Sequence, residues 1–199
     1  MRAILAVAWL LAADPYWVSK ECAQWSEEEL ELFLNDSPWA RAAEAVAMRG
    51  ARGRSSQTFL ASAEPMRAAE LEWRRRRLPK DLRENDGAWQ EYQEFLGKDG
   101  GKFLVLAVAI PKAATMDAGE MAEMENQSKL RIGKKKVKMS GYFPASESDP
   151  FTRLLFAREG SEEAKELVFE LYVPGDGGGN FREAIYVRKE MQWKGRVAF

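Results

Sequence analysis

The sequence predicts an α+β fold in which N-terminal helices pack on a predominantly antiparallel β-sheet or sandwich. Apolar residues recur at helical spacing through most of the first hundred positions, and from Phe103 onward they run continuously or alternate, as they do in strands. The chain has 199 residues, of which 46% are hydrophobic and 31% charged, so it can bury a core without a disulfide or a structural metal. Because no repeat or low-complexity linker interrupts it, we expect a single domain over residues 14–199.

Four helices are predicted in the first hundred residues. Ser26 and Glu29 form a capping box for one helix, Ser37-Pro38 has the residue types that begin a second, and Pro65 and Asp86-Gly87 introduce two more. The residues expected on their buried faces are, in chain order, Leu30, Phe33 and Leu34, then Trp39, Ala43, Val46 and Ala47, then Met66, Ala69 and Trp73, and finally Trp89, Tyr92 and Leu96.

The strands are predicted mainly in the second half. Phe103–Ile110 is continuously apolar and bounded by glycine and proline, which favours a central strand buried on both faces. Leu167–Val173 alternates with a period of two, as a sheet strand does, and a short helix is expected from Met116 to Met124. The other expected strands are Thr58–Ala63, a hairpin that pairs Leu130 and Ile132 with Val137 and Met139 across Gly133-Lys134, a strand with Ile185 and Val187, and a last strand, Arg196–Phe199, after a turn at Lys194-Gly195.

The N-terminus has the composition of an export signal. Arg2 is followed by the apolar run Ala3–Ala13, which Asp14-Pro15 ends. We therefore expect a signal peptide over residues 1–13, cleavage near Ala13 and a periplasmic or secreted protein; the alternative is that this segment belongs to the buried core. No integral membrane segment is expected in the mature chain, because its longest apolar run, Phe103–Ile110, falls short of the ~20 residues that cross a bilayer.

The composition excludes several kinds of chemistry. The chain has no histidine, which rules out Ser-His-Asp and Cys-His catalysis and zinc sites of the HExxH type. Its single cysteine, Cys22, cannot form an internal disulfide. The 30 Lys+Arg and 31 Asp+Glu leave a net charge of −1, so no overall positive field attracts nucleic acid. We predict no catalytic residue, no bound cofactor and no metal ligand.

Two glycine-rich stretches resemble phosphate-binding loops only superficially. Gly175–Gly179 lies between two predicted strands, whereas a phosphate loop leads into a helix N-terminus, so we interpret it as a hairpin loop. Gly97–Lys102 precedes a strand, lacks the first glycine of a P-loop and has Phe103 where Ser or Thr is required.

The charged stretches have interpretations that need no ligand. Arg74–Arg77, beside Trp73, and Lys134–Lys136 are expected to be a solvated helix end and a solvated hairpin, the alternative being a nucleic-acid surface if both converge. The acidic stretch Glu147-Ser148-Asp149 lacks the glycine and the distal glutamate of a calcium loop. Helix capping and a solvated helix face account for the carboxylates Glu27, Glu28, Glu29 and Glu31.

Seven tryptophans are many for a chain of this length: Trp9, Trp17, Trp25, Trp39, Trp73, Trp89 and Trp193. Exposed, they would form a platform for a glycan or peptide, but at helical spacing they favour the core. We expect Trp39→Ala to lower the free energy of unfolding by about 3–5 kcal/mol, as a core truncation does, measured by urea denaturation of the purified variant. Unchanged unfolding would place Trp39 on the surface.

Three segments resemble a known group of proteins. They are Trp25-Ser26 through Leu34-Asn35-Asp36-Ser37-Pro38-Trp39-Ala40, then Ser62-Ala63-Glu64-Pro65-Met66-Arg67-Ala68-Ala69, and Lys189-Glu190-Met191 with Gly195-Arg196-Val197. Together they are similar to a family of uncharacterised exported bacterial proteins with a DSPWA-type segment, close to the GWxTD-domain proteins, although the GWxTD pentapeptide itself does not occur here. The resemblance implies export and an α+β fold, and it implies no catalytic residue.

The leading functional hypothesis is an exported, non-enzymatic binding or interaction domain at the cell envelope, with a protein or a glycan as its ligand. Its alternative is a hydrolase that uses an Asp/Glu pair assembled only by the fold, which sequence spacing does not exclude. A third hypothesis is a cytoplasmic protein that binds nucleic acid through Arg74–Arg77.

Overall fold

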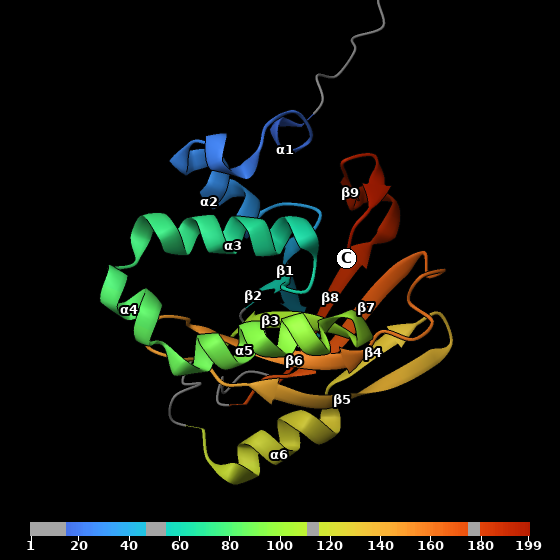
Figure 1. Cartoon of the computed structure of the whole chain (residues 1–199). Helices are drawn as coiled ribbons and strands as arrows, with labels where there is room; N and C mark the ends of the chain where they lie inside the picture. Colours follow the sequence, from blue (N-terminus) through green and yellow to red (C-terminus); the bar gives the residue numbers. More distant parts are fainter. Residues whose placement is uncertain (1–14, 47–54, 111–115, 175–179) are drawn as a thin grey trace, which may run out of the picture.

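The centre of the molecule is a closed barrel of eight antiparallel strands, ordered β1-β2-β3-β6-β5-β4-β7-β8 (Figure 1). The computed structural model describes residues 15–46, 55–110, 116–174 and 180–199. The barrel strands are β1 (Ala40–Ala45), β2 (Ser56–Leu60), β3 (Phe103–Ala109), β4 (Lys129–Ile132), β5 (Lys135–Phe143), β6 (Phe151–Ala157), β7 (Glu166–Tyr172) and β8 (Phe181–Val187), and a separate two-stranded sheet holds β9 (Gln192–Trp193) and β10 (Arg196–Val197).

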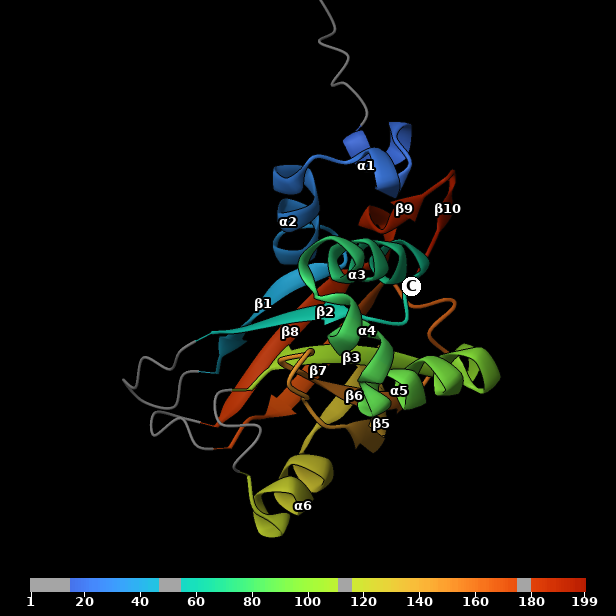
Figure 2. The same ribbon diagram turned by 60° about the vertical axis from the view of Figure 1, so that its left-hand side comes forward.

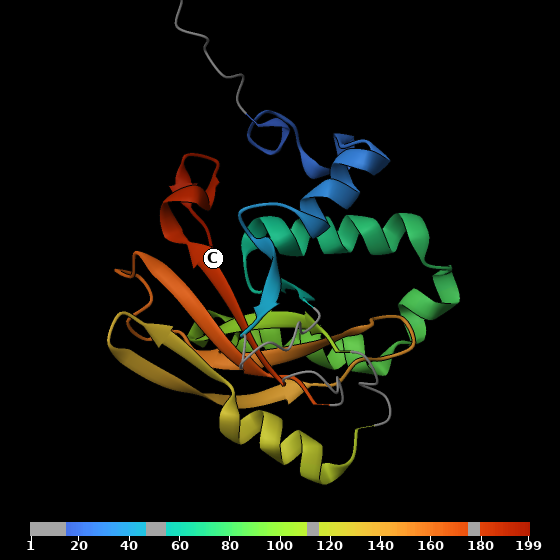
Figure 3. The same cartoon turned by 180° about the vertical axis from the view of Figure 1, so that it is seen from behind.

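The prediction of N-terminal helices packed on a predominantly antiparallel β-sheet or sandwich is therefore wrong. β1 pairs with β2 on one side and with β8 on the other, where Glu44 opposes Glu183 and Ala45 opposes Arg182. This last pairing closes the sheet on itself and removes its edges. The helices lie on the outside of the resulting barrel (Figure 3).

The error has an identifiable origin in β1. Residues after Ser37-Pro38 were expected to form a helix, since alanine and glutamate favour helices in isolation. Instead Ser37 forms a β-bridge with Ala40, and Ala40–Ala45 is a strand because Ala40–Ala43 pairs with β2. Tertiary pairing overrides the local preference. Of the expected buried face, Trp39 and Ala43 are buried, Val46 is exposed, and Ala47 lies outside the described residues.

The remaining helix predictions are confirmed, with small shifts at the ends. Ser26 and Glu29 form the capping box of α2, Pro65 lies in the first turn of α3, and Asp86 caps α5 through the backbone N–H of Trp89. The helix predicted at 116–124 begins at Ala118 behind a capping box of its own. The helical segments are α1 (Tyr16–Ser19), η1 (Cys22–Gln24), α2 (Glu27–Asn35), α3 (Glu64–Arg77), α4 (Lys80–Asn85), α5 (Gly87–Lys98), η2 (Gly100–Lys102), α6 (Ala118–Gln127) and η4 (Arg188–Glu190).

The helices cover two regions of the barrel surface. Figures 1 and 2 show α3, α4 and α5 as a continuous run along one side, with α2 next to α3, whereas α6 lies at the opposite end of the molecule. α6 contacts β5 and β7. Among the described residues, none of the helices has the length and apolar character needed to span a bilayer.

The interior of the barrel is filled by side chains. Phe156 on β6 and Phe169 on β7 belong to strands that are not neighbours, yet their ring centroids are 5.3 Å apart, so they meet across the interior. Phe169 also contacts Tyr186 at 5.7 Å, and the Tyr186 hydroxyl shares a hydrogen bond of 2.8 Å with that of Thr58. A ligand site is therefore expected on the outside of the barrel.

Strand alternation gives β2, β3 and β6 a second buried face, on the outer side of the barrel. Phe59, Val105 and Arg153 point this way, opposite to the interior residues. α3 and α5 cover this face, because Glu70 of α3 and the rings of α5 contact Arg153. β3 is thus buried on both faces, as Phe103–Ile110 predicts.

An aromatic cluster joins the two ends of the described chain. Trp25, Phe33, Trp39 and Trp193 form its centre, and the indole N–H of Trp39 donates to the carbonyl of Ala198. Trp39 is fully buried, which agrees with its predicted place in the core. Trp25, Trp89 and Trp193 are also buried, Trp17 and Trp73 are half-buried, and Trp9 lies outside the described residues.

Candidate functional site

The arginine run Arg74–Arg77 is paired with carboxylates. On the outer side of α3, Arg75 and Arg76 both bind Glu72, at 2.7 and 2.6 Å. Arg76 also binds Glu27 of α2, and Arg77 binds Glu27 and Glu31 at 3.0 and 2.6 Å. The arginine run of α3 and the carboxylates of α2, which the sequence presents as separate charged stretches, therefore hold the two helices together. We call this set of ion pairs the outer clamp; it consists of Arg75–Arg77, Glu27, Glu31 and Glu72.

The other stretches considered in the sequence do not converge on this region. Lys134–Lys136 lies at the β4-β5 turn, on the opposite side of the molecule from the C-terminal end of α3 (Figures 1 and 3). Gly97–Lys102 connects α5 to β3 through η2, so it precedes a strand as expected. The glycine cluster Gly175–Gly179 lies outside the described residues.

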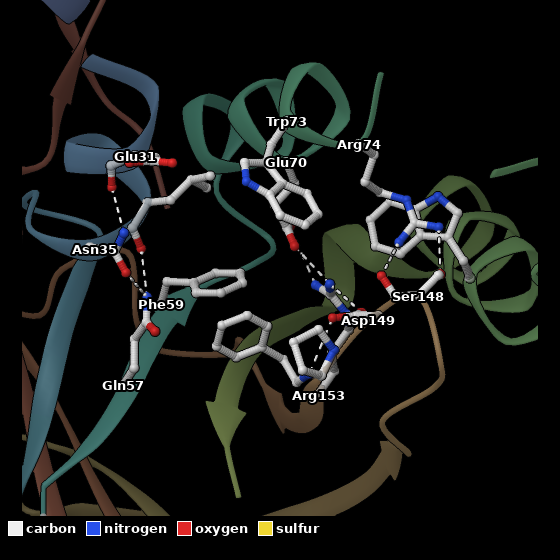
Figure 4. Close-up of a pocket in the computed structure, with 14 residues that line it drawn as sticks. Glu31, Asn35, Gln57, Phe59, Glu70, Trp73, Arg74, Ser148, Asp149 and Arg153 are labelled. Atoms are coloured by element: carbon white, nitrogen blue, oxygen red, sulfur yellow. Dashed lines mark hydrogen bonds and ion pairs between the residues drawn. The ribbon is translucent and has the colours of Figure 1, made fainter. Parts of the chain in front are cut away.

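A cavity of about 260 Å³ lies between α2, α3 and the outer face of the barrel (Figure 4). Four aromatic side chains line it: Phe59, Trp73, Trp89 and Phe151. Residues from α2 and β2 form one side of it, including the amides of Asn35 and Gln57, and the loop before β6 forms the other. Its size suits a small molecule or a single side chain of a larger partner.

The floor of the cavity holds a buried guanidinium bound by two carboxylates. Arg153 is 2% exposed, and its Nη2 donates to Glu70 Oε1 at 2.7 Å and to Asp149 Oδ2 at 2.6 Å. Its Nη1 donates to Glu70 Oε2 at 3.3 Å, and its Nε donates to Asp149 at 2.9 Å. Glu70 comes from α3, Asp149 from the loop before β6, and Arg153 from β6, so the fold assembles this group from distant parts of the chain.

A second buried pair adjoins the first. Arg74 binds Asp86 at 3.2 Å and donates to the carbonyl and the hydroxyl of Ser148 at 3.1 and 2.9 Å. Asp86 also accepts from the Ser148 hydroxyl and from the backbone N–H of Trp89. We call Arg153, Glu70, Asp149, Arg74 and Asp86 the inner cluster.

Aromatic rings surround the two guanidinium groups. The Arg74 guanidinium carbon lies 4.0 Å from the ring centroid of Trp89, and that of Arg153 lies 4.9 Å from the same ring and 4.3 Å from that of Tyr92. Cation–π contacts of this length stabilise a charge most where water is excluded. They explain how these arginines are accommodated beneath α3 and α5.

Burial and hydrogen bonding shift the pKa values of the buried carboxylates in opposite directions. Burial raises the pKa of Glu70 above its usual range, although Arg153 acts to lower it. At Asp86, burial also acts to raise the pKa, but hydrogen bonds from Ser148, from the backbone N–H of Trp89 and from Arg74 prevail and lower it. The inner cluster therefore contains one carboxylate, Glu70, whose charge is poorly compensated.

Some polar groups on the cavity wall bond to no other described residue. The indole N–H of Trp73 and Oε1 of Gln57 make no hydrogen bond with any other part of the chain that the structure describes, while Gln57 Nε2 donates to Asn35 Oδ1 and to the carbonyl of Leu34. One free donor and one free acceptor thus stand among apolar rings, which is the composition typical of a ligand pocket.

Acid–base chemistry fits the arrangement less well. Glu70 and Asp149 line the same cavity, but both accept from the same nitrogen of Arg153 instead of facing each other across an open cleft. Over the described ranges, no three His, Cys, Asp or Glu side chains are grouped so that they could hold a metal ion.

Sequence reasoning considered Trp73, Trp89, Arg74 and Asp149 separately but missed Glu70 and Arg153, although two signals were present. Glu70 and Arg74 follow Met66 at spacings of four and eight, on the stripe that was expected to be apolar. Arg153 stands inside the apolar run that forms β6, a strand that was not predicted. A charge within an apolar pattern indicates a buried partner.

Comparison with protein-family models, with curated proteins and with solved structures finds no match to this chain.

Proposed function

We propose that this protein is an exported, non-enzymatic binding domain of the cell envelope, whose ligand enters the cavity between α2, α3 and the barrel. The observation that carries the proposal is the cavity itself, which is preformed, lined by four aromatic side chains and supplied with a free donor on Trp73 and a free acceptor on Gln57. Since rings meet across the barrel interior, the outer cavity is the better candidate for a ligand.

Export is supported by the apolar segment Ala3–Ala13 and by the resemblance to exported proteins. Tyr16 packs against Trp17 and Trp25, and Trp17 against Phe33. A mature chain that starts at Asp14 keeps all of these contacts. N-terminal sequencing of the protein recovered from cells tests this part, because a protein with intact Met1 in the cytoplasm would contradict export.

Nucleic acid is not the proposed partner, since Arg75, Arg76 and Arg77 already bind carboxylates of the outer clamp. The alternative function is a hydrolase that uses Glu70 and Asp149. Their place in one cavity favours it, but their shared bonds to Arg153 direct both carboxyls toward the guanidinium instead of toward each other across a cleft.

The binding function is tested by a fragment screen that uses the indole N–H signals in ¹⁵N NMR spectra. A fragment that binds in the cavity shifts the signal of Trp73, and Trp73→Ala removes the binding. Trp17→Ala is the matched control, because Trp17 is also half-buried but belongs to the aromatic cluster. If no fragment of any charge shifts the Trp73 signal, the proposal fails.

A further inference from the structure

The inner cluster contains more negative than positive groups. Its ion pairs connect two guanidinium groups, Arg153 and Arg74, with three carboxylates. Arg74 is matched by Asp86, whereas Arg153 is shared between Glu70 and Asp149. With all of these groups ionised, one negative charge remains without a counter-charge, in a site where every member is buried or nearly so. An isolated buried charge is costly, so the site favours a group that neutralises it.

The excess charge is located at the cavity. Glu70 lines the cavity together with Phe59 and Trp73, and Figure 4 shows its carboxylate directed toward Arg153 at the cavity floor. Each Glu70 oxygen accepts one hydrogen bond, from Arg153 Nη2 and Nη1 respectively, so each retains capacity for another donor. The raised pKa of Glu70 is consistent with incomplete compensation by Arg153.

We propose that the cavity binds an alkylammonium group, whose cation pairs with Glu70 and whose aliphatic stem lies between the aromatic rings. This deepens the proposed binding function and rests on it. Phe59 and Trp73, whose aromatic side chains line the cavity, offer cation–π attraction to such a group. An anionic ligand is disfavoured, because it would enter a site that already holds an unmatched carboxylate.

The lining of the walls selects an alkyl stem over a sugar. A sugar ring needs several hydrogen-bonding partners, and the polar wall side chains of Asn35, Ser148 and Asp149 already bond to other parts of the chain. Apolar side chains, including Leu34, Pro150 and Phe151, line much of the remaining wall. An unbranched chain with a single charged end matches this distribution.

The test is a titration of the mature protein at neutral pH with three probes of similar size, n-butylammonium, n-pentanol and butyrate, followed through the indole signal of Trp73. We expect n-butylammonium to bind at least ~10-fold more tightly than n-pentanol, and butyrate not to bind. In Glu70→Gln this preference falls to about 1 while n-pentanol still binds. Glu72→Gln is the matched control, since Glu72 belongs to the same helix but does not line the cavity, and it keeps the preference.

The outcomes separate the inference from the function on which it depends. Equal binding of n-butylammonium and n-pentanol, or a preference that survives Glu70→Gln, overturns the cation proposal and leaves a binding pocket. Absence of binding by every probe and every fragment overturns both. Nα-acetyl-lysine N-methylamide then distinguishes the source of the ammonium group: binding as tight as that of n-butylammonium indicates a protein side chain, and weaker binding indicates a free amine.

Discussion

Glu70 and Glu72 are two residues apart on α3, both bind arginine and both are buried to a similar extent, at 7% and 8% exposure. Their pKa values nevertheless move in opposite directions. Hydrogen bonds from Arg75 and Arg76 lower the pKa of Glu72 to about 2, whereas burial raises that of Glu70. The difference lies in the depth of burial and in the ratio of partners. Glu72 alone serves two guanidinium groups at the edge of α3, whereas Glu70 lies deeper, against the barrel, and shares one guanidinium with Asp149, so both effects set the direction of the pKa change.

The largest expected effect comes from removing the shared guanidinium. Arg153→Met leaves Glu70 and Asp149 buried without their counter-charge, and we expect it to lower the free energy of unfolding at neutral pH by about 3–5 kcal/mol. Near pH 4 the loss is smaller, because burial raises the pKa of Glu70 and its carboxyl is then largely protonated and neutral. Urea denaturation at both pH values measures the difference. A loss below about 1 kcal/mol at neutral pH would show that the cluster is not sealed from water.

Removing the central carboxylate of the outer clamp has a moderate effect. Glu72→Gln loses charged hydrogen bonds to Arg75 and Arg76, and since Arg75 remains solvated we expect a loss of about 1–2 kcal/mol at neutral pH. The lowered pKa of Glu72 sets the sign of the pH dependence: its contribution is full above the ordinary value of 4.5 and disappears as the pH falls toward about 2. Urea denaturation from pH 7 to pH 2.5 should therefore show wild type and variant converging, and a constant gap would contradict the assignment.

Glu70→Gln is expected to have the opposite pH dependence. A carboxyl whose pKa is raised on folding contributes stability fully below its ordinary value of 4.5, and this contribution disappears as the pH rises through the raised pKa. The variant has no carboxyl at this position, so its free energy of unfolding should rise relative to that of wild type between pH 4 and pH 8. Thermal unfolding across that range measures the change. A variant that loses stability with rising pH, relative to wild type, would show that Arg153 compensates both carboxylates.

The local part of the fold could be predicted from the sequence, because its causes are local. Ser26 and Asp86 cap helices through their own side chains, and the period-two pattern of Leu167–Val173 is a property of one strand. Barrel closure is different, since it depends on β1 meeting β8 across more than a hundred residues. An alanine-rich segment such as Ala40–Ala45 carries no sign of that pairing.

The ion pairs of the candidate site could not be predicted from the sequence for the same reason. The sequence places Arg74–Arg77 on one helix, but it does not show that Arg74 faces inward to Asp86 while Arg77 faces α2. Asp149 was considered only as part of a calcium loop, and its partner Arg153 lies in a strand that was not predicted. Composition reveals which charges exist, and only the fold determines which of them share a partner.

The smallest effect is expected at the exposed end of the arginine run. Arg77 is 44% exposed and binds Glu27 and Glu31, which are about as exposed, at 50% and 53%. Ion pairs of this kind contribute about 0–1 kcal/mol and are screened by salt, so Arg77→Ala should lower the free energy of unfolding by no more than that, and by less in 0.5 M NaCl. Urea denaturation at low and high salt measures both values. Arg74, three positions before Arg77 on α3, is buried together with its partner Asp86. Arg74→Ala removes the counter-charge of that carboxylate, so its loss should be several times larger and insensitive to salt. Equal losses at Arg74 and Arg77 would contradict the distinction between the inner cluster and the outer clamp.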